Sequence, residues 1–414
     1  MNGHLLASLD IGTGKVICAV AELSPEQEFC VTAVGQEELG GALRRGMVVS
    51  VKKVAAAIES AIEEAELVLP WSVEDVFLSV SGEHVRGFAG TGTVSVGSSD
   101  EQGASEITRE DVAKAEEAAR AVGLPAGCRV LETIRRDYAV DGFERLREPP
   151  MGLNAEQLSA RIYTVISDKV ATQNLEQCVR QADRFVSGVY PSALASGMAV
   201  LSEDEMEMGV VAVDVGAGTT DVAVFKDGTL AHLGVVSLGG DLITSDLQSL
   251  RVSLQEAEKL KTKWAVASDS MVDAKKSMKV PRLGGRGTFT VSHAVVSQIV
   301  IQRVEEIFEA VSREISKSGL DSTELPGGMV VTGGSSRLPG LVEAAGEVTG
   351  LPVELGKPTG FETATELVSS PEYSTAVGLL LLGLRKVGES ERWTRERFFS
   401  EVKSKIAEIL KKLR

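Results

Sequence analysis

The sequence predicts an α/β protein made of two related lobes, each with a central mixed sheet flanked by helices. Apolar strands that end in an aspartate and turn back through alternating glycines occur twice, at 5–23 and at 210–225. A third apolar strand enters a glycine pair within 328–340. Because the same strand, turn and strand unit is repeated, we expect an internal duplication in which each lobe supplies one turn to a shared site.

The two repeated turns have a composition suited to phosphate. Glycines at alternate positions let the backbone approach a ligand closely, so that successive amide groups surround phosphate oxygens. An aspartate at the head of each turn, Asp10 or Asp214, would hold Mg²⁺ through water beside those oxygens. The candidate phosphate-binding residues are Asp10, Gly12, Thr13, Gly14 and Lys15 in the first turn, and Asp214, Gly216, Ala217, Gly218 and Thr219 in the second.

Two well-known phosphate motifs do not describe these turns. The sequence has no Walker A pattern, and neither turn runs from a strand into a helix as a dinucleotide fingerprint does. The alternative interpretation is a pair of ordinary glycine hairpins. One such turn would not decide between the interpretations, but two turns that each follow an apolar strand ending in aspartate favour a shared phosphate site.

Two further glycine pairs extend the candidate site. The turn Gly333-Gly334-Ser335 has no side chain at its glycines that would intrude on an adenine or ribose ring. Gly239 and Gly240 precede an expected helix, whose N-terminal amides would face a phosphate. A simple strand-to-helix turn is the alternative for this second pair.

Composition narrows the class of protein. The 414 residues are 43% hydrophobic and 25% charged, which suits a chain of several folded domains. A net charge of −16 argues against a nucleic-acid-binding surface. The four cysteines and four histidines are scattered, so we expect neither a zinc site nor a disulfide framework. The N-terminus has no signal-peptide pattern, and the longest apolar stretch, 376–384, is too short to span a bilayer, so we expect a cytoplasmic protein.

The C-terminus has the opposite charge to the rest of the chain. Residues 392–414 contain eight basic and three acidic side chains, a net charge of +5, which leaves −21 for the remainder. On a helix, the apolar residues of this segment gather on one face. We expect a helix that lies in the plane of an anionic membrane, with a terminal helix packed against protein as the alternative. The candidate membrane residues are Trp393, ahead of the expected helix, and Phe398, Phe399, Val402, Ile406, Ile409, Leu410 and Leu413.

The motifs follow an order found in one superfamily. Residues 10–15, 214–221 and 330–335 resemble the phosphate 1, phosphate 2 and adenosine motifs of the actin, heat-shock-70 and sugar-kinase ATPases. Residues 190–197 and 373–378 resemble the two connecting helices of that superfamily. The resemblance implies duplicated actin-like, ribonuclease H-like lobes and a cleft that binds ATP and Mg²⁺.

Within the superfamily, matches along essentially the whole chain resemble the FtsA family of bacterial cell division proteins. They lie at 46–51, 81–85, 107–112, 194–196, 239–246 and 257–261. In the inserted module we expect strands at 85–96, 129–138 and 160–166 and a helix at 109–122 capped by Thr108. The resemblance implies subdomain 1A at 1–82, 164–204 and 372–388, an α+β subdomain 1C at 83–163, subdomain 2A at 205–245 and 319–371, subdomain 2B at 246–318, and a linker with an amphipathic helix at 389–414.

The family resemblance also implies a function. The ATP-bound form would polymerise, and the tail would attach it to the inner face of the cytoplasmic membrane at the division site. Residues 246–318 would bind the C-terminal peptide of the tubulin-like protein FtsZ, while subdomain 1C would contact other subunits and other division proteins. Two alternatives are a PilM-like pilus assembly protein, against which the basic tail argues, and a sugar kinase, for which we find no catalytic aspartate or sugar-binding constellation.

Details of the site follow from the same resemblance. Glu258 and Lys261, one helical turn apart, match a Glu and a Lys that flank adenosine in relatives, with an exposed helix ion pair as the alternative. Where relatives often carry a Glu or Gln to orient the attacking water, this chain has Tyr190. A phenol with a pKa of about 10 is a poor base at neutral pH. We therefore expect ATP binding with slow or absent hydrolysis, and the sequence identifies no catalytic residue.

Overall fold

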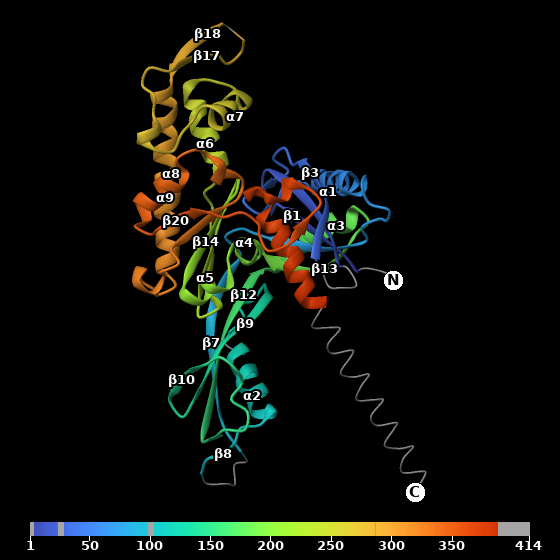
Figure 1. Cartoon of the computed structure of the whole chain (residues 1–414). Coiled ribbons are helices and arrows are strands. Elements are labelled where there is room, and N and C mark those ends of the chain that lie inside the picture. The colour runs from blue at the N-terminus through green and yellow to red at the C-terminus, as the bar shows by residue number, and fades with distance from the viewer. Residues whose placement is uncertain (1–3, 24–28, 98–102, 122, 286, 388–414) are drawn as a thin grey trace.

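The computed structural model describes residues 4–23, 29–97, 103–121, 123–285 and 287–387. Two α/β lobes lie side by side, and a small domain in cyan and green extends from the first of them (Figure 1). No helix within the described ranges is long and apolar enough to cross a membrane. The predicted membrane residues between 393 and 413 lie outside the described ranges.

The first lobe is built on a six-stranded sheet in the order β13-β6-β1-β2-β3-β21. Within it, β1 pairs with β2 antiparallel and with β6 parallel. Helix α1 (Val51–Glu66) packs on β2 and β3 and contacts α3 (Lys169–Gln181), while the helix at 374–387 lies against β1, where the Ser8 hydroxyl donates to the Ala376 carbonyl. The strands are β1 (His4–Ile11), β2 (Lys15–Leu23), β3 (Phe29–Glu38), β6 (Asp75–Val80), β13 (Phe185–Pro191) and β21 (Glu362–Thr363), with a small hairpin β4 (Leu43–Arg44) and β5 (Met47–Val48) beside them.

The second lobe repeats this arrangement. Its sheet has the order β16-β15-β14-β19-β20. β14 pairs with β15 antiparallel and with β19 parallel, as β1 does with β2 and β6, so the five strands match the first sheet in order, without its edge strand β21. The predicted duplication is therefore confirmed. The strands are β14 (Val210–Val215), β15 (Thr220–Lys226), β16 (Thr229–Val236), β19 (Met329–Thr332) and β20 (Val353–Leu355).

The helices of the second lobe bury one continuous apolar core. The long helix α8 (His293–Ser316) crosses this lobe and carries a hairpin beyond the sheet, at the top of Figure 1. Around it lie α6 (Gly240–Leu247), α7 (Leu254–Lys263), α9 (Leu341–Thr349) and the hairpin of β17 (Ser277–Pro281) and β18 (Thr288–Ser292). The apolar side chains of α4 (Ser192–Val200) and α5 (Glu203–Met208) belong instead to the core that contains the first sheet. Short 3₁₀ turns at 248–250, 269–271, 322–324, 334–337, 366–369 and 371–373 join these elements.

The small domain has its own antiparallel sheet, in the order β10-β9-β12-β7, covered by α2 (Arg109–Arg120). Thr108 caps α2, as predicted, and the structure adds a capping box with Asp111. The helix ends two residues before the predicted end. A Cβ at Gly90 or Gly92 would lie within 2.3 Å of the α2 backbone, so these glycines allow the helix to lie close to β7. The strands are β7 (Arg86–Ser95), β8 (Ser105–Glu106), β9 (Cys128–Val140), β10 (Phe143–Leu146), β11 (Asn154–Ala155) and β12 (Gln157–Asp168).

The two predicted connecting helices cross where the lobes meet. A Cβ at Gly378, in the helix 374–387, would lie 1.7 Å from the carbonyl oxygen of Ala195 in α4. Real Cβ atoms do not approach a backbone oxygen so closely, so the two helix backbones are in direct contact at this glycine.

Gly378→Ala is expected to lower the free energy of unfolding by about 1–3 kcal/mol, because the added methyl group forces the connecting helices apart. Gly346→Ala in α9 is a matched control, since a Cβ there would meet its nearest atoms at an ordinary 3.6 and 3.7 Å. Its better helix propensity should leave stability unchanged or raise it by up to about 1 kcal/mol. Urea and thermal unfolding of both variants test this, and equal midpoints would contradict the contact.

Candidate functional site

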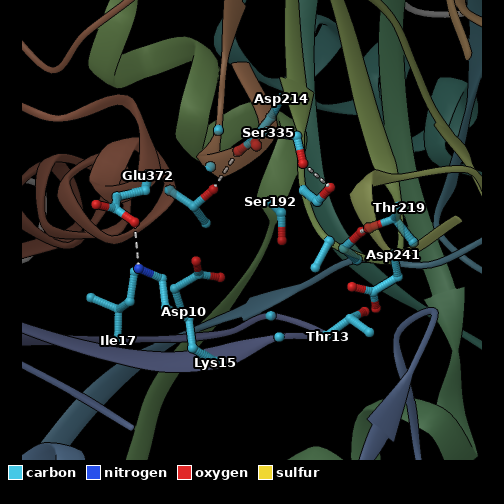
Figure 2. A pocket seen from close by; sticks show the side chains of 18 of the residues that line it. Asp10, Thr13, Lys15, Ile17, Ser192, Asp214, Thr219, Asp241, Ser335 and Glu372 are labelled. Carbon is cyan, nitrogen blue, oxygen red and sulfur yellow. Dashed lines mark hydrogen bonds and ion pairs between the residues drawn. The ribbon is translucent and has the colours of Figure 1, made fainter. Parts of the chain in front are cut away.

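A cavity of about 610 Å³ lies between the two lobes, where the three glycine turns converge. The first turn joins β1 to β2, the second joins β14 to β15, and the third follows β19 (Figure 2). Segments far apart in the sequence therefore meet at one place. The predicted site residues that line the cavity are Asp10, Gly12, Thr13, Gly14, Lys15, Asp214, Gly216, Ala217, Thr219, Glu258, Lys261, Gly333, Gly334 and Ser335.

The first two turns are closed in the same way. The N–H of Gly12 donates to the carbonyl of Lys15 at 3.0 Å, and the N–H of Gly216 donates to the carbonyl of Thr219 at 2.9 Å. The same hydrogen bond at the same step of each hairpin shows that the duplication extends into the site itself.

The two turns also touch each other. A Cβ at Gly218 would lie 2.4 Å from the hydroxyl oxygen of Thr13, and one at Gly14 would lie 3.2 Å from the Cβ of Ala217. Because a side chain at Gly218 would have no room, glycine is what lets the lobes meet at this point. Gly218 therefore faces the opposite turn rather than the cavity, although the sequence placed it with the phosphate-binding residues.

Gly239 and Gly240 differ from the prediction. The amides of Gly240 and Asp241 donate to the carbonyls of Gly216 and Ala217 at 3.0 and 2.8 Å, so they are engaged with the second turn and do not face a ligand. A Cβ at Gly239 would lie 2.6 Å from the Ala217 oxygen. The glycine pair lets α6 support the second turn from behind, and α6 reaches the cavity through Asp241 instead.

The third turn also rests on the second. Gly333 has a φ of +86°, which favours glycine, and a Cβ there would lie 2.1 Å from a carboxylate oxygen of Asp214. The Ser335 hydroxyl donates to the Gly216 carbonyl at 2.9 Å. The third turn is thus fixed against the head of the second, and its contact with adenosine stays a prediction.

Three carboxylates face the cavity, of which Asp214 and Asp221 are buried and Asp10 is half-buried. Burial raises the pKa of Asp10 above its usual range. Burial, with the charge of Asp10, raises the pKa of Asp214 to about 7. Burial, with the charge of Asp214, raises the pKa of Asp221 well above its ordinary value. Ionising all three groups together is therefore unfavourable, and a cation among them would offset this cost.

Each of these carboxylates accepts a hydrogen bond from a hydroxyl on another segment. The sequence indicated none of these hydroxyl partners, because they depend on tertiary contacts. Asp221 itself ends the second motif and was not included among the predicted site residues. The pairs are Ser79 with Asp10 at 2.7 Å, Thr375 with Asp214 at 2.8 Å, and Ser81 with Asp221, at 2.8 Å from both carboxylate oxygens.

The site fits a hydrated divalent cation better than a directly ligated one. In the described ranges, no three His, Cys, Asp or Glu side chains are placed to hold a metal ion by themselves. A Mg²⁺ ion commonly keeps several waters and takes one or two carboxylates together with phosphate oxygens. Asp10 and Asp214 suit this role, because burial raises the pKa of both carboxyl groups and a cation between them and a phosphate would favour their ionised forms.

Lys15 is engaged by a residue that the sequence did not indicate. Its Nζ lies 2.6 Å from Oε2 of Glu372 and 5.3 Å from the centroid of the Tyr373 ring. Arg337 lies 3.0 Å from the other oxygen of Glu372. Glu372 therefore holds two basic side chains at the edge of the cavity. In the sequence, only its position directly before the expected helix at 373–378 indicated that it could lie near the site.

Glu258 and Lys261 form the ion pair that was the alternative interpretation, at 2.8 Å on α7. They also line the cavity, so their contact with adenosine stays a prediction. Both side chains bond the Thr244 hydroxyl of α6, at 2.6 Å from Glu258 and 2.9 Å from Lys261. These bonds join α6 to α7 at the cavity wall.

Tyr190 does not line this cavity. Its side chain is buried beside the Phe77 ring and lines a second cavity of about 700 Å³. Ser192, the first residue of α4, lines the cavity between the lobes instead (Figure 2). A serine hydroxyl is too weak a base to accept a proton from the attacking water at neutral pH, so Ser192 at the start of α4 supplies no general base.

Two family models match the chain. The model described as Cell division protein FtsA matches residues 211–378, and the model described as SHS2 domain inserted in FTSA matches residues 82–166. The second range includes α2 and, except for the last two residues of β12, the four-stranded sheet of the small domain.

Several relatives are named Cell division protein FtsA. The Pseudomonas aeruginosa protein is 36% identical over 386 residues, which are 93% of this chain and 90% of that protein. The Neisseria meningitidis protein is 35% identical over 376 residues, 91% of this chain and 89% of that protein. The Escherichia coli (strain K12) protein is 31% identical over 413 residues, 98% of this chain and 96% of that protein.

Solved structures share the fold at lower identity. The PilM-PilN type IV pilus biogenesis complex aligns with a TM-score of 0.62 and 16% identity over 91% of this chain and 98% of that chain. MreB5 of Spiroplasma citri bound to ADP aligns with a TM-score of 0.57 and 11% identity over 94% of this chain and 98% of that chain. These likenesses show an actin-like fold, and the identity to division proteins over nearly the whole chain shows that this protein belongs to the FtsA family.

Proposed function

We propose that the chain binds ATP with Mg²⁺ between its lobes, and that the ATP-bound form polymerises and tethers FtsZ filaments to the inner face of the cytoplasmic membrane. The observation that carries ATP binding is the convergence of two matching turns, led by Asp10 and Asp214, on one cavity. Membership of the FtsA family supports a role in cell division. MreB5, which has the same fold and is bound to ADP, supports a nucleotide as the ligand.

The phosphates would lie between the first two turns, beside the hydroxyls of Thr13 and Thr219 and the ammonium of Lys15. Asp10 and Asp214 would hold Mg²⁺ through water, and the bound ion would neutralise charge on both the carboxylates and the phosphates. Lys15 now contacts Glu372, so phosphate binding would exchange one anionic partner for another.

The adenosine would lie against the third turn, between Gly333-Gly334 and the α7 pair of Glu258 and Lys261. Hydrolysis would be slow or absent, because the residue that faces the cavity at the start of α4 is Ser192. Binding of ATP, rather than its turnover, would then set the polymerising state.

The remaining roles are assigned to segments outside the cleft, with the subdomain boundaries predicted from the sequence. Residues 246–318 would bind the FtsZ C-terminal peptide, and the inserted module at 83–163 would contact neighbouring subunits and other division proteins. Residues 392–414 would bind the anionic membrane at the division site through their apolar face and basic side chains.

Asp214→Asn and Asp10→Asn are each expected to weaken Mg²⁺-ATP binding at least about tenfold, or about 1.4 kcal/mol, because each removes a carboxylate that faces the cation. The difference should shrink when EDTA removes the metal. Calorimetric titration with ATP measures both effects. Asp204→Asn, at an exposed position on α5, is the control, and equal affinity in all variants would contradict the proposed site.

The affinity for Mg²⁺-ATP is expected to rise between about pH 6 and pH 8, by up to about tenfold per pH unit below the pKa of Asp214. That pKa is raised to about 7, so below it the cation must displace a proton. Titrations at several pH values measure the slope. Asp214→Asn should flatten this slope. An unchanged slope in this variant would show that the displaced proton belongs to another group.

The free energy of unfolding without metal is expected to fall as the pH rises, whereas the affinity for Mg²⁺-ATP rises. The pKa of Asp214 is about 7 when folded and 3.8 in a solvated chain, so the folded state keeps its proton longer. The stabilisation that protonated Asp214 gives the folded state is complete below about pH 4 and is lost as the pH rises towards 7. Unfolding midpoints measured in EDTA should therefore fall over this range, and less steeply in Asp214→Asn.

Ile406→Asp is expected to weaken binding to phosphatidylglycerol vesicles by about tenfold or more, because a buried isoleucine contributes about 1.5–3 kcal/mol. Ser404→Asp makes the same charge change on the opposite face of the expected helix and is the control. Vesicle sedimentation measures both, beside a chain that lacks 392–414. Equal binding by the truncated and complete chains would refute the membrane role and would favour a PilM-like protein.

A further inference from the structure

An exposed apolar patch lies at one edge of the first lobe, away from the ATP cavity. It is formed by the start of β13 and the connection between α1 and β6. The amide of Phe185 donates to the Glu74 carbonyl at 2.9 Å, which holds the start of β13 beside that connection. Large apolar side chains exposed together indicate an interaction surface. The patch consists of Leu67, Val68, Trp71 and Phe185, which are between 52 and 82% exposed.

Carboxylates flank this patch. The neighbouring arginines are already engaged, Arg184 with Glu66 at 3.7 Å and Arg180 with Glu176 at 4.0 Å. Within the described ranges, no basic side chain lies at ion-pair distance from the flanking carboxylates, so the patch suits an apolar partner with positive charge. The exposed flanking carboxylates are Glu63, Glu74, Asp75 and Asp183.

The described chain ends close to the patch. The Nζ of Lys386 donates to the carbonyl of Ser187 at 2.6 Å, and Ser187 lies two residues beyond Phe185 in β13, about 7 Å along the strand. The end of the red helix beside β13 is visible in Figure 1. The 27 residues that follow include the segment 392–414, whose net charge is +5 and whose apolar side chains share one face of the expected helix. The linker 388–391 can extend over about 14 Å, so the segment can reach the patch.

We infer that the patch docks residues 392–414 of the same chain and so withholds them from the membrane. The apolar face of the segment covers the four patch side chains, and its lysines and arginines meet the flanking carboxylates. Docking and membrane binding exclude each other, because both bury the same apolar face. This inference rests on the proposed membrane role of the segment and adds its regulation.

The double variant Trp71→Ser, Phe185→Ser of the full chain is expected to bind phosphatidylglycerol vesicles about 3- to 10-fold more tightly than the natural chain. The apparent affinity for vesicles is the intrinsic affinity multiplied by the fraction of chains whose tail is undocked. The variant raises this fraction, so its apparent affinity should rise. Leu283→Ser, at an equally exposed leucine in the β17–β18 hairpin loop, is the control and should leave binding unchanged. Unchanged binding by the double variant would overturn the inference, and weaker binding would show that the patch itself contacts lipid.

A photo-reactive benzoylphenylalanine in place of Trp71 tests docking directly in an otherwise natural chain. Without vesicles it should cross-link within one chain to a peptide from 388–414, and added vesicles should remove this product. Cross-links between two chains, or to other segments only, would overturn the inference. If no chain binds vesicles, the proposed membrane role fails, while the intrachain cross-link still decides whether the segment docks.

Discussion

Asp10, Asp214 and Asp221 share one small space between the lobes, and each makes the ionisation of the others less favourable. Burial is the largest cause of their raised pKa values, and for Asp214 and Asp221 the charge of the neighbouring carboxylates adds to it. Without a cation, the raised pKa values favour the protonated carboxyl groups. Because Asp221 of the second lobe is bonded to Ser81 of the first, a change in charge acts directly on the contact between the lobes. A cation-bound triphosphate would alter this contact at its centre, which is a physical route from the ligand to the shape that a filament recognises.

The same cleft depends on backbone atoms as much as on charged groups. Gly218 meets Thr13 across the lobes, Gly333 meets Asp214, and Gly378 meets Ala195 in the connecting helices. A methyl group would meet the short Thr13 side chain at Gly218, a carboxylate oxygen and backbone at Gly333, and backbone at Gly378. The glycines thus have two functions. They shape turns that suit a phosphate, and they set how closely the lobes can approach.

Local pattern predicted the parts of the fold that depend on local physics. The strand, turn and strand units, the capping of α2 by Thr108 and the inserted strands were all predicted from periodicity, glycine spacing and cap residues. The partners of the carboxylates could not be predicted, because Ser79, Ser81 and Thr375 meet them only after the chain has folded. Gly239 and Gly240 were misinterpreted for a related reason. Their pattern fits an open helix terminus, but the second turn already occupies their amides.

The shared fold does not by itself separate division proteins from pilus proteins, since the PilM-PilN complex aligns over most of the chain at 16% identity. Sequence identity over nearly the whole chain makes that separation. Within the chain, the C-terminal segment 392–414 differs from the rest by its charge. A body of charge −21 is repelled by an anionic surface, whereas a tail of +5 is attracted to it. The same opposition of charge attracts the tail to its own body. Salt screens both attractions over about 8 Å, but it does not screen the burial of the apolar face. If the segment binds both surfaces as proposed, the balance between membrane and patch would be set mainly by which surface buries that face better, and charge would set how quickly the segment reaches either one.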